Sequence, residues 1–353
     1  MKSNRKYVSV SLLLILLVVS FGTAMMSDNN IKNTNSQNGY LIETSESIDP
    51  IEINGNDELA SHPRVIGSGT WADPHVIEDF EILGSGSGTG VKISNTNKFL
   101  IIQNCMIEDY DYGIYLYNVS NVEIANNTAS YNEYDGIVLT ESNNNTFIDN
   151  TASNNKANGI ALFESKNNTL TGNTASNNLR DGIYLYLSKD NTLIDNIFAN
   201  NKGYGIYLFI SDNSKLFNNS MKSDGIVVFG YLATLLSYEI NESNKVNGKS
   251  IYYYKNQIGL EKSDYTNAGQ IFLINCTNSL IAEVNIYDVS IGIFLFYSDN
   301  NTLTDNIISY NFHLGIYFHY SDNNTIYKNS FYKVCRFFAQ NSVSIYPTRN
   351  CNQ

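Results

Sequence analysis

The sequence predicts an all-β fold, a single-stranded, right-handed parallel β-helix of about 11–12 turns with a cap at each end. Three columns of residues recur with a 23-residue period: a glycine, a large apolar residue and an asparagine. Such self-similarity indicates one structural unit copied along the chain. The glycines are Gly90, Gly113, Gly136, Gly159, Gly182 and Gly205, and the period resumes at Gly269, Gly292 and Gly315.

The segment after each glycine has the two-residue period of a strand, as in Gly182-Ile183-Tyr184-Leu185-Tyr186. The repeat is too short for a four-stranded propeller blade and lacks the helix of a leucine-rich repeat. Each repeat is therefore expected to form one turn of two or three short strands, stacked at about 4.8 Å on its neighbours. The apolar column is Ile101, Ile124, Phe147, Leu170, Leu193, Leu216, Leu303 and Ile326.

The asparagine column is expected to form a buried structural ladder. A buried asparagine can bond both to a bend of the backbone and to the asparagine of the next turn, which satisfies its amide. The ladder residues are Asn104, Asn127, Asn150, Asn173, Asn196 and Asn219, with later copies at Asn306 and Asn329.

The N-terminal residues predict export to the cell surface or beyond. Basic residues precede an apolar run from Tyr7 to Phe21, with small residues near Ala24, so residues 1–26 are interpreted as a signal peptide. A retained anchor helix is the alternative. No integral membrane domain is expected once the signal peptide is removed. Residues 27–48 are rich in Asn and Ser and predict a flexible tether.

The rest of the chain divides into caps and coil. Residues 49–89 do not fit the repeat, contain Trp71, and are expected to cap the N-terminal end. Residues 90–330 form the predicted β-helix, with irregular turns over 225–268 where the period fails. Residues 331–353 are expected to cap the other end.

Four cysteines occur, without a Cys-x-x-Cys pair. Cys105 and Cys276 lie within the repeat pattern and are expected to pack in the core. Cys335 and Cys351 could form a disulfide in the C-terminal cap, which export would permit.

The formal net charge of −12 argues against nucleic acid and anionic membranes as partners. The four histidines form no compact ligand set, so no metal site is predicted from them. No cofactor is expected, although paired carboxylates would suit Ca²⁺.

Outward positions on the glycine strand are rich in aromatic residues. Flat ring faces suit the C–H faces of sugars, so a row at the turn spacing could hold a long polysaccharide. Cross-strand stabilisation of the sheet and contact with other cell-envelope proteins are the alternatives. The candidate ligand-binding residues are Tyr115, Tyr117, Tyr184, Tyr186, Tyr207, Phe209, Phe294, Phe296 and Tyr317.

Glu141 and Glu164 are candidate catalytic residues, because a 23-residue separation places them on adjacent turns at the same bend. Their expected spacing of about 5 Å is close to that of a retaining glycosidase pair. The alternative is that both are solvated bend residues, since a repeat aligns carboxylates by construction.

The pattern over residues 181–196, from Asp181-Gly182-Ile183-Tyr184 to Asp195-Asn196, resembles the repeats of the NosD-like right-handed β-helix family. This family belongs to the pectin-lyase-like superfamily, whose repeats are called carbohydrate-binding and sugar-hydrolysis repeats. Residues 247–254 and 268–276 are similar to segments of archaeal members, and residues 67–78 resemble archaeal cell-surface proteins of this kind.

The resemblance implies the fold, and no catalytic residue transfers with it. The aromatic face makes a polysaccharide or surface glycan the leading ligand. The sequence thus favours a secreted or cell-surface protein that binds or displays on glycan through its aromatic face. A polysaccharide hydrolase or lyase on the same scaffold and a structural or adhesion rod are the alternatives. A copper-maturation role like that of NosD is disfavoured, since no copper ligands accompany the resemblance. Whether the protein is an enzyme is left undecided, with binding preferred.

Overall fold

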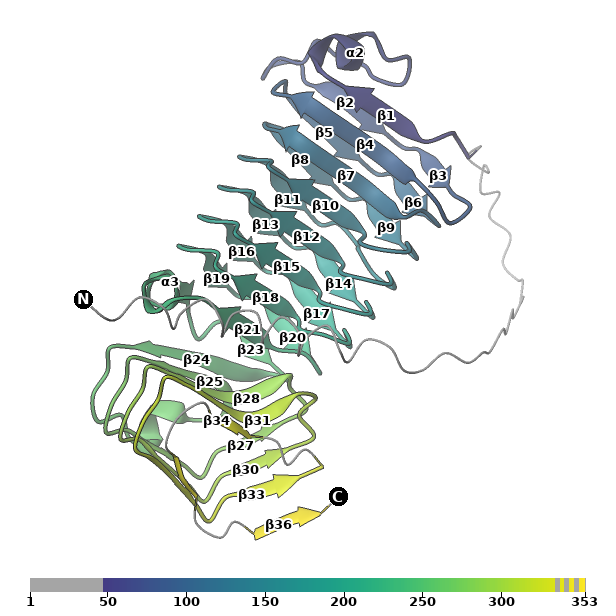
Figure 1. Ribbon diagram of the computed structural model, residues 1–353. Coiled ribbons are helices and arrows are strands. Elements are labelled where there is room, and N and C mark those ends of the chain that lie inside the picture. The colour runs from purple at the N-terminus through teal and green to yellow at the C-terminus, as the bar shows by residue number, and fades with distance from the viewer. Residues whose placement is uncertain (1–46, 334–336, 340–342, 346–348, 353) are drawn as a thin grey trace, which may run out of the picture. The chain divides into compact units, whose positions relative to one another are not determined.

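The computed structural model describes residues 47–333, 337–339, 343–345 and 349–352, with side chains up to residue 333. These residues form a right-handed parallel β-solenoid of about 11 turns with about 23 residues in each (Figure 1). The predicted fold class is therefore confirmed. The predicted signal peptide, most of the tether, and the side chains of Cys335 and Cys351 lie outside the described residues.

The strands at the glycines from Gly90 to Gly205 lie in one eight-stranded sheet, here called the glycine sheet, whereas Gly269, Gly292 and Gly315 lie on strands of a different sheet. All its neighbouring strands pair in parallel, as in Ile137 with Ile160 and Ile160 with Ile183. Its strands, in spatial order, are β1 (Ile51–Asn54), β4 (Thr89–Thr96), β7 (Tyr112–Val119), β10 (Ile137–Thr140), β12 (Ile160–Phe163), β15 (Ile183–Tyr186), β18 (Ile206–Phe209) and β21 (Ile226–Phe229).

Two further faces close each turn of this first part of the coil. The second sheet contains β2 (His75–Glu78), β5 (Leu100–Gln103), β8 (Val122–Ala125), β11 (Thr146–Ile148), β13 (Thr169–Thr171), β16 (Thr192–Ile194), β19 (Lys215–Phe217) and β22 (Glu239–Ile240). The third face contains β3 (Glu81–Leu83), β6 (Met106–Glu108) and β9 (Thr128–Ser130), then β14 (Thr174–Ser176), β17 (Ile197–Ala199) and β20 (Ser220–Lys222).

The later part of the coil extends the third face. The sheet that begins with β14, β17 and β20 continues through β23 (Lys245–Val246), β24 (Lys249–Lys255), β25 (Ala268–Ile274), β28 (Ile291–Phe296), β31 (Leu314–His319) and β34 (Phe337–Ala339). Two four-stranded sheets close its turns. They are β26 (Leu280–Ala282), β29 (Thr302–Thr304), β32 (Asn324–Tyr327) and β35 (Val343–Ile345), and β27 (Asn285–Tyr287), β30 (Ile307–Ser309), β33 (Ser330–Tyr332) and β36 (Arg349–Asn352).

Short helices accompany the coil at three places. Helix α2 (Asn56–Ser61) follows β1 and buries Leu59 at the N-terminal end. Helix α3 (Leu232–Ser237) and the 3₁₀ helix η1 (Lys262–Tyr265) lie in the irregular region. Within the described residues, no helix is long and apolar enough to cross a membrane.

The glycine period arises because the chain enters each glycine strand through a very crowded position. A Cβ atom added at Gly159 would lie 2.7 Å from the Ala152 carbonyl oxygen and 2.7 Å from Ala175 Cβ. Real Cβ atoms do not approach this closely, so only glycine fits while the core side chains of adjacent turns stack.

The asparagine ladder is present and runs further than predicted, to Asn244. Asn150 Nδ2 donates to Asn173 Oδ1 (2.9 Å) and to the Ile124 carbonyl (2.7 Å), and the Asn150 backbone N–H donates to the same Asn173 oxygen. Each buried amide thus links three consecutive turns, which satisfies polar groups that water cannot reach.

Asn104 is not part of this ladder, contrary to the sequence prediction. It is exposed, and Cys105 occupies the ladder position, with its N–H donating to Asn127 Oδ1 (2.9 Å). The bend after β4 is one residue longer than the bend after β7, because Leu100 pairs with Val122 rather than with a residue 23 positions away. A one-residue slip exchanges the inward and outward faces, so Ile102 also replaces Ile101 in the core column.

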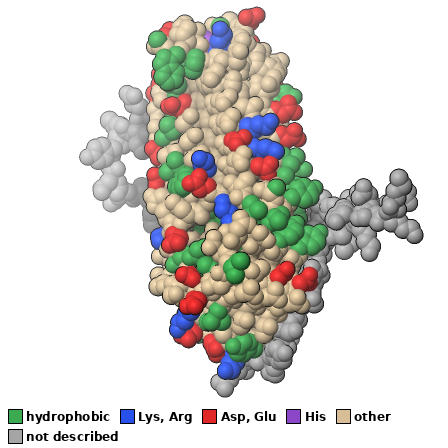
Figure 2. Space-filling model, turned by 90° about the vertical axis from the view of Figure 1, so that its left-hand side faces the viewer, with side chains coloured by type: hydrophobic (Ala, Val, Ile, Leu, Met, Phe, Trp, Pro, Cys, Tyr) green, Lys and Arg blue, Asp and Glu red, His purple; other side chains and the backbone are tan. Residues whose placement is uncertain are grey.

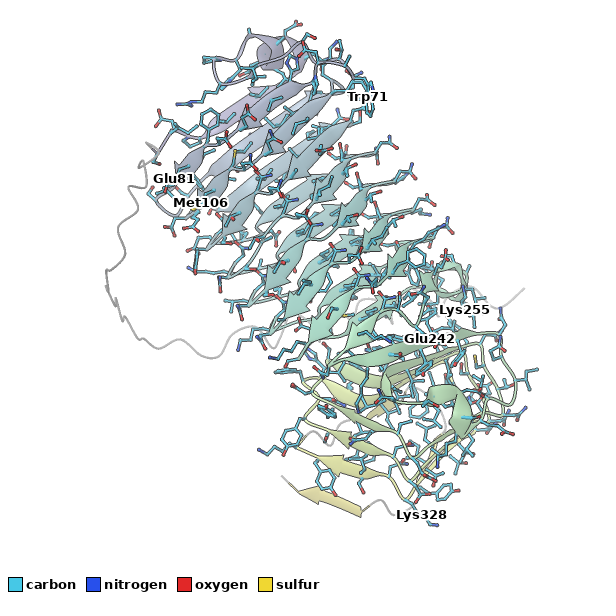
Figure 3. The ribbon with its side chains drawn as sticks, turned by 180° about the vertical axis from the view of Figure 1, so that it is seen from behind. Trp71, Glu81, Met106, Glu242, Lys255 and Lys328 are labelled. Atoms are coloured by element: carbon cyan, nitrogen blue, oxygen red, sulfur yellow. The ribbon has the colours of Figure 1, made fainter. Side chains whose placement is uncertain are left out.

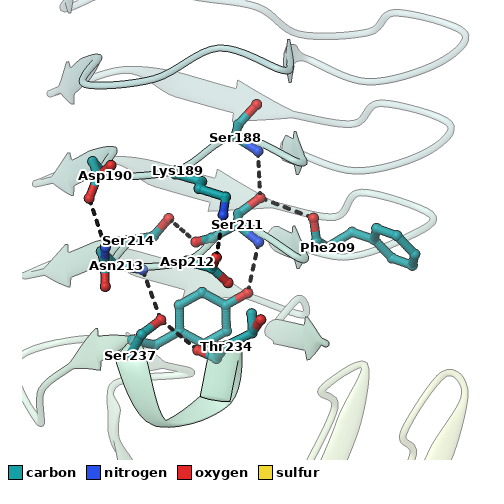
Figure 4. Close-up of polar contacts among 11 residues, drawn as sticks. Ser188, Lys189, Asp190, Phe209, Ser211, Asp212, Asn213, Ser214, Thr234 and Ser237 are labelled. Carbon is teal, nitrogen blue, oxygen red and sulfur yellow. Dashed lines mark hydrogen bonds and ion pairs between the residues drawn. The ribbon is translucent and has the colours of Figure 1, made fainter. Parts of the chain in front are cut away.

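A second ladder of buried side chains consists of serines. The Ser165 N–H donates to the Ser188 hydroxyl. The Ser188 N–H in turn donates to the Ser211 hydroxyl (Figure 4). At the last turn the Tyr238 hydroxyl takes the serine's place and accepts from the Ser211 N–H (3.2 Å). Tyr238 follows α3, so the ladder ends where the helix interrupts the repeat.

The glycine sheet ends at β21, and the chain changes faces over residues 230–270. Strand β23 pairs antiparallel with β24, which then pairs in parallel with β25 on the third face. Lys255, labelled in Figure 3, donates to the carbonyls of Leu236 (3.0 Å) and Tyr238 (2.8 Å) and thereby caps the C-terminal end of α3.

The edge of β21 is completed by one side chain. Fully buried Gln270 accepts from the Ile226 N–H (3.0 Å) and donates to the carbonyls of Ile226 (2.7 Å) and Ile291 (2.8 Å). Its amide takes the place of the next strand's backbone and joins the two parts of the coil.

Asn173→Ala should lower the free energy of unfolding by about 2–3 kcal/mol, because it leaves the Asn150 N–H and the Phe147 carbonyl without their buried partner. Denaturant unfolding measures the change, and Lys166→Ala on the exposed bend of the same turn is the control. Equal stability of the two variants would contradict a ladder role for Asn173.

Gln270→Leu should destabilise the fold by about 3 kcal/mol, since three backbone groups lose their partner in a buried place. Gln270→Glu should also destabilise, because an ionised carboxylate cannot donate to the two carbonyls. Thermal unfolding compares both with Gln257→Leu at an exposed position. Wild-type stability of Gln270→Leu would show that the junction does not depend on this amide.

Candidate functional site

Outward side chains of four consecutive glycine-sheet strands, β12, β15, β18 and β21, form an aromatic strip. All its members are partly exposed. Figure 2 shows hydrophobic side chains, in green, gathered at the right-hand edge of the view. The aromatic strip consists of Phe163, Tyr184, Tyr186, Tyr207, Phe209 and Phe229.

The rings of the strip stack on each other from turn to turn. Tyr186 and Phe209 lie 5.2 Å apart at 13°, and Phe209 and Phe229 lie 5.2 Å apart at 10°. Tyr184 and Tyr207 stack at 5.1 Å and 21°. The ring faces predicted to contact sugars are therefore largely covered by neighbouring rings, and ring edges and phenol groups remain for contact.

Two apolar residues extend the strip at a strained backbone position. Leu187 (φ 51°) and Ile210 (φ 47°) follow β15 and β18 and lie in the left-handed region, which disfavours residues other than glycine and asparagine. Both are partly exposed. Glu141 and Glu164 adopt the same conformation at the corresponding bend of earlier turns, so the bend of the coil imposes this strain, which costs roughly 1–2 kcal/mol for each such residue.

Sequence reasoning missed Phe163, Phe229, Leu187 and Ile210. Phe229 does not fit the 23-residue period, because Ile206 pairs with Ile226, which is only 20 residues later. The pattern Gly225-Ile226-Val227-Val228-Phe229 would have revealed it. Leu187 and Ile210 occupy the bend column that holds Glu141 and Glu164 in earlier turns, and an apolar residue in that column was the available signal.

Tyr115 and Tyr117 lie on β7, away from the strip. Between them and Tyr184, the outward positions are taken by Val138 and Ala161, both of which are buried. The Tyr115 hydroxyl lies 3.4 Å from Thr140 Oγ1 on the next turn. The structure thus separates these two candidates from the main group.

Phe294, Phe296 and Tyr317 are buried rather than exposed, which corrects their prediction as surface residues. Their relative exposures are 1%, 0% and 9%. After the change of face at the junction, nearly all residues of β25, β28 and β31 are buried, so both sides of these strands are covered. Phe294 stacks on Phe272 at 4.4 Å, and His319 lies 6.1 Å from Phe229 at the end of the strip.

Glu141 and Glu164 lie on adjacent turns, as the spacing implied. The Glu141 N–H donates to the Phe163 carbonyl (3.0 Å), and both glutamates are exposed at left-handed bends, with φ of 51° and 49°.

Across the described residues, no group of three or more His, Cys, Asp or Glu side chains could hold a metal ion.

In contrast to the exposed Glu141 and Glu164, two other carboxyl groups, those of Asp181 and Asp224, are buried. Burial raises the pKa of Asp181 to about 7, and its Oδ1 accepts from the Tyr204 N–H (2.7 Å). Burial likewise raises the pKa of Asp224 to about 7. Asp224 follows Asn201 at the end of a second column of buried asparagines. Its carboxylate accepts hydrogen bonds from the backbone N–H (2.9 Å) and from Nδ2 (2.8 Å) of Asn201. These contacts make both carboxyl groups parts of the scaffold.

Two family models each match a part of the chain. Residues 89–236 match the family model of the right-handed beta helix region. Residues 225–346 match the model of the periplasmic copper-binding protein NosD. The predicted resemblance to NosD-like right-handed parallel β-helix proteins is thereby confirmed. Comparison with curated protein sequences gives no match.

Solved structures with similar folds include the periplasmic alginate epimerase AlgG (20% identity, TM-score 0.42, covering 72% of this chain and 50% of that one). The A-module of Azotobacter vinelandii mannuronan C-5 epimerase AlgE6 has 14% identity and a TM-score of 0.40, covering 72% and 64%. The catalytic domain of a GH87 alpha-1,3-glucanase has 14% identity and a TM-score of 0.41, covering 84% and 62%. The chain spans between half and two thirds of these structures.

Asp224→Asn should stabilise the protein at pH 8 by a few degrees in Tm, at about 2–4 °C per kcal/mol in a medium-sized protein. The folded pKa of Asp224 is raised, so its contribution to stability falls as pH increases from the unfolded value of about 3.8 to about 7. An asparagine cannot ionise and continues the ladder. The gain should disappear near pH 4, and an equal gain at both pH values would contradict this account.

Proposed function

We propose that the protein is an exported glycan-binding β-helix that holds an extended, neutral polysaccharide along the aromatic strip. The observation that carries the proposal is a continuous surface of aromatic side chains repeated at the turn spacing of the coil. A ligand built from repeating units suits a surface built from repeating units. Aromatic rings and phenol groups supply both apolar contact and hydrogen bonds to such a ligand.

The tyrosines of the strip are suited to bind hydroxyl groups. Burial raises the pKa of Tyr184 and of Tyr207, so both phenols stay protonated at any physiological pH. A neutral phenol can donate and accept hydrogen bonds. Contact through phenol groups and ring edges replaces the flat stacking that the sequence suggested, because the ring faces are largely occupied by one another.

The charge of the protein favours a neutral polymer over an acidic one. The formal net charge of −12 would repel a polyanion, and an attractive basic stripe is needed to overcome such repulsion. The strip itself consists of uncharged residues, next to exposed Glu164 and a Lys189–Asp212 ion pair (2.7 Å).

The proposal predicts that Tyr184→Ala combined with Tyr207→Ala weakens glycan binding by at least about tenfold, or roughly 1.4 kcal/mol. The phenylalanine variants at the same positions keep the stacked rings and remove only the hydroxyls, so they separate hydrogen bonding from packing. A glycan array followed by titration calorimetry on the array's best ligand measures the affinities.

Tyr332→Ala on β33 is the matched control, since this tyrosine is exposed on a different sheet. Circular dichroism and thermal unfolding confirm that the variants are folded. Unchanged affinity of the folded Tyr184/Tyr207 double variant would exclude the strip as the binding surface. An array on which no glycan is bound would contradict the proposed function as a whole.

A further inference from the structure

Trp71, the chain's only tryptophan, is the most exposed of the large hydrophobic side chains that the structure describes. Its relative exposure is 82%, and Figure 3 shows it at the edge of the coil, at the opposite end from Lys328. It lies far along the chain from the aromatic strip, in the hairpin that precedes β2. An indole held in water loses the burial free energy that large aromatic residues normally gain.

The hairpin around Trp71 is built to hold this exposed position. Thr70 and Asp73 exchange backbone hydrogen bonds (3.0 and 3.2 Å) across the turn that contains Trp71. Gly67 (φ 84°) and Gly69 (φ 71°) supply left-handed backbone, and a Cβ at Gly67 would lie 1.9 Å from the Pro74 carbonyl oxygen. The position of the indole is therefore a consequence of a tight, glycine-dependent turn rather than of a loose loop.

Beside Trp71 lies a cleft of about 310 Å³, here called the Trp71 cleft. Its apolar lining includes Trp71, Pro74 and Phe99. Its lining also carries polar groups from two successive turns of the second sheet. The polar residues are Asn121, Glu123, Asn144 and Thr146.

The indole lines this cleft and is largely open to solvent. Its ring contact is edge-to-face with Phe99, at 5.6 Å and 74°, which can cover at most one of its two faces. This differs from the aromatic strip, where near-parallel stacking covers the faces. A free aromatic face next to amide, hydroxyl and carboxylate groups matches a ligand with one C–H face and a hydroxyl-bearing rim.

We propose that the Trp71 cleft binds one pyranose ring of a neutral saccharide, with the sugar stacked on the indole and its hydroxyls bonded to Asn121, Glu123, Asn144 and Thr146. The inference rests on the proposed glycan-binding function and adds a second, separate site to it. A half-exposed carboxylate such as Glu123 accepts hydrogen bonds from paired hydroxyls, a contact that strengthens recognition of a neutral sugar. Among the described residues that line the cleft, Phe99 is the one further aromatic ring, and a cage for a quaternary ammonium ion needs several.

Because the chain has a single tryptophan, its fluorescence reports on this cleft alone. The experiment titrates the full chain with soluble cello-, manno- and xylo-oligosaccharides, and with oligogalacturonate as an anionic comparison. Asn144 begins an Asn-Asn-Thr sequon, so the protein is produced in a host that adds no N-glycans. The proposal expects a saturable change of Trp71 emission with at least one neutral saccharide and none with oligogalacturonate.

Glu123→Gln and Asn144→Ala keep the fluorophore and should weaken the titrated affinity by about three- to tenfold, as expected for lost hydrogen bonds. Trp71→Ala, measured by calorimetry, should weaken it by about tenfold or more. Lys98→Ala, exposed before Phe99, is the control and should leave the titration unchanged.

The outcomes separate this inference from the proposed function. Glycan binding on the array, with Tyr184/Tyr207 variants impaired but Trp71 emission unaffected by every saccharide, would overturn the Trp71 site and leave the strip intact. A Trp71 response that survives the Tyr184/Tyr207 double variant would support an independent site. Equal affinities of wild type, Glu123→Gln and Asn144→Ala would contradict the proposed sugar contacts.

Discussion

The structure depends on a constant register between successive turns of the backbone. Parallel strands bond only to the turns on either side, so one residue of slip would exchange buried and exposed side chains over a whole face. Two features hold the register where water is excluded. Glycines such as Gly159 occupy a position with no room for a Cβ atom, and buried side chains such as Asn150 bond to three turns at once. Apolar packing alone would tolerate many more alternatives than this polar ladder.

The same constraint shapes the surface. A column of outward residues runs straight along the coil, so the side chains of Tyr186, Phe209 and Phe229 meet and stack. Stacking stabilises the sheet but covers the ring faces, which limits how the strip can contact a ligand. Trp71 is outside the repeat, and its hairpin leaves the indole largely exposed, without a parallel-stacked ring among the described contacts. The proposed glycan function therefore combines a regular surface that provides length with an irregular site that provides stacking.

Most of the fold follows from the period in the sequence, because each turn has the same environment as its neighbours. The columns of Ile114, Ile137 and Ile160 and the later asparagines were predictable for this reason. Asn104 was misplaced because an extra residue in a polar bend carries no signal of its own. The burial of Phe294 and Phe296 was hidden as well, since it depends on the change of face after β21 and on contacts between segments far apart in the chain.

The central claim is that buried amides bond from one turn to the next rather than to residues nearby in sequence. Residue-resolved hydrogen exchange on Asn196→Ala tests it most directly, because Asn196 Oδ1 is the acceptor for the backbone N–H of Asn173, 23 residues earlier (3.0 Å). The account predicts faster exchange at the Asn173 amide, while the amide of Ile197, which donates to the Asn173 carbonyl, keeps its protection. Faster exchange confined to the sequence neighbours of residue 196, with Asn173 unchanged, would contradict it.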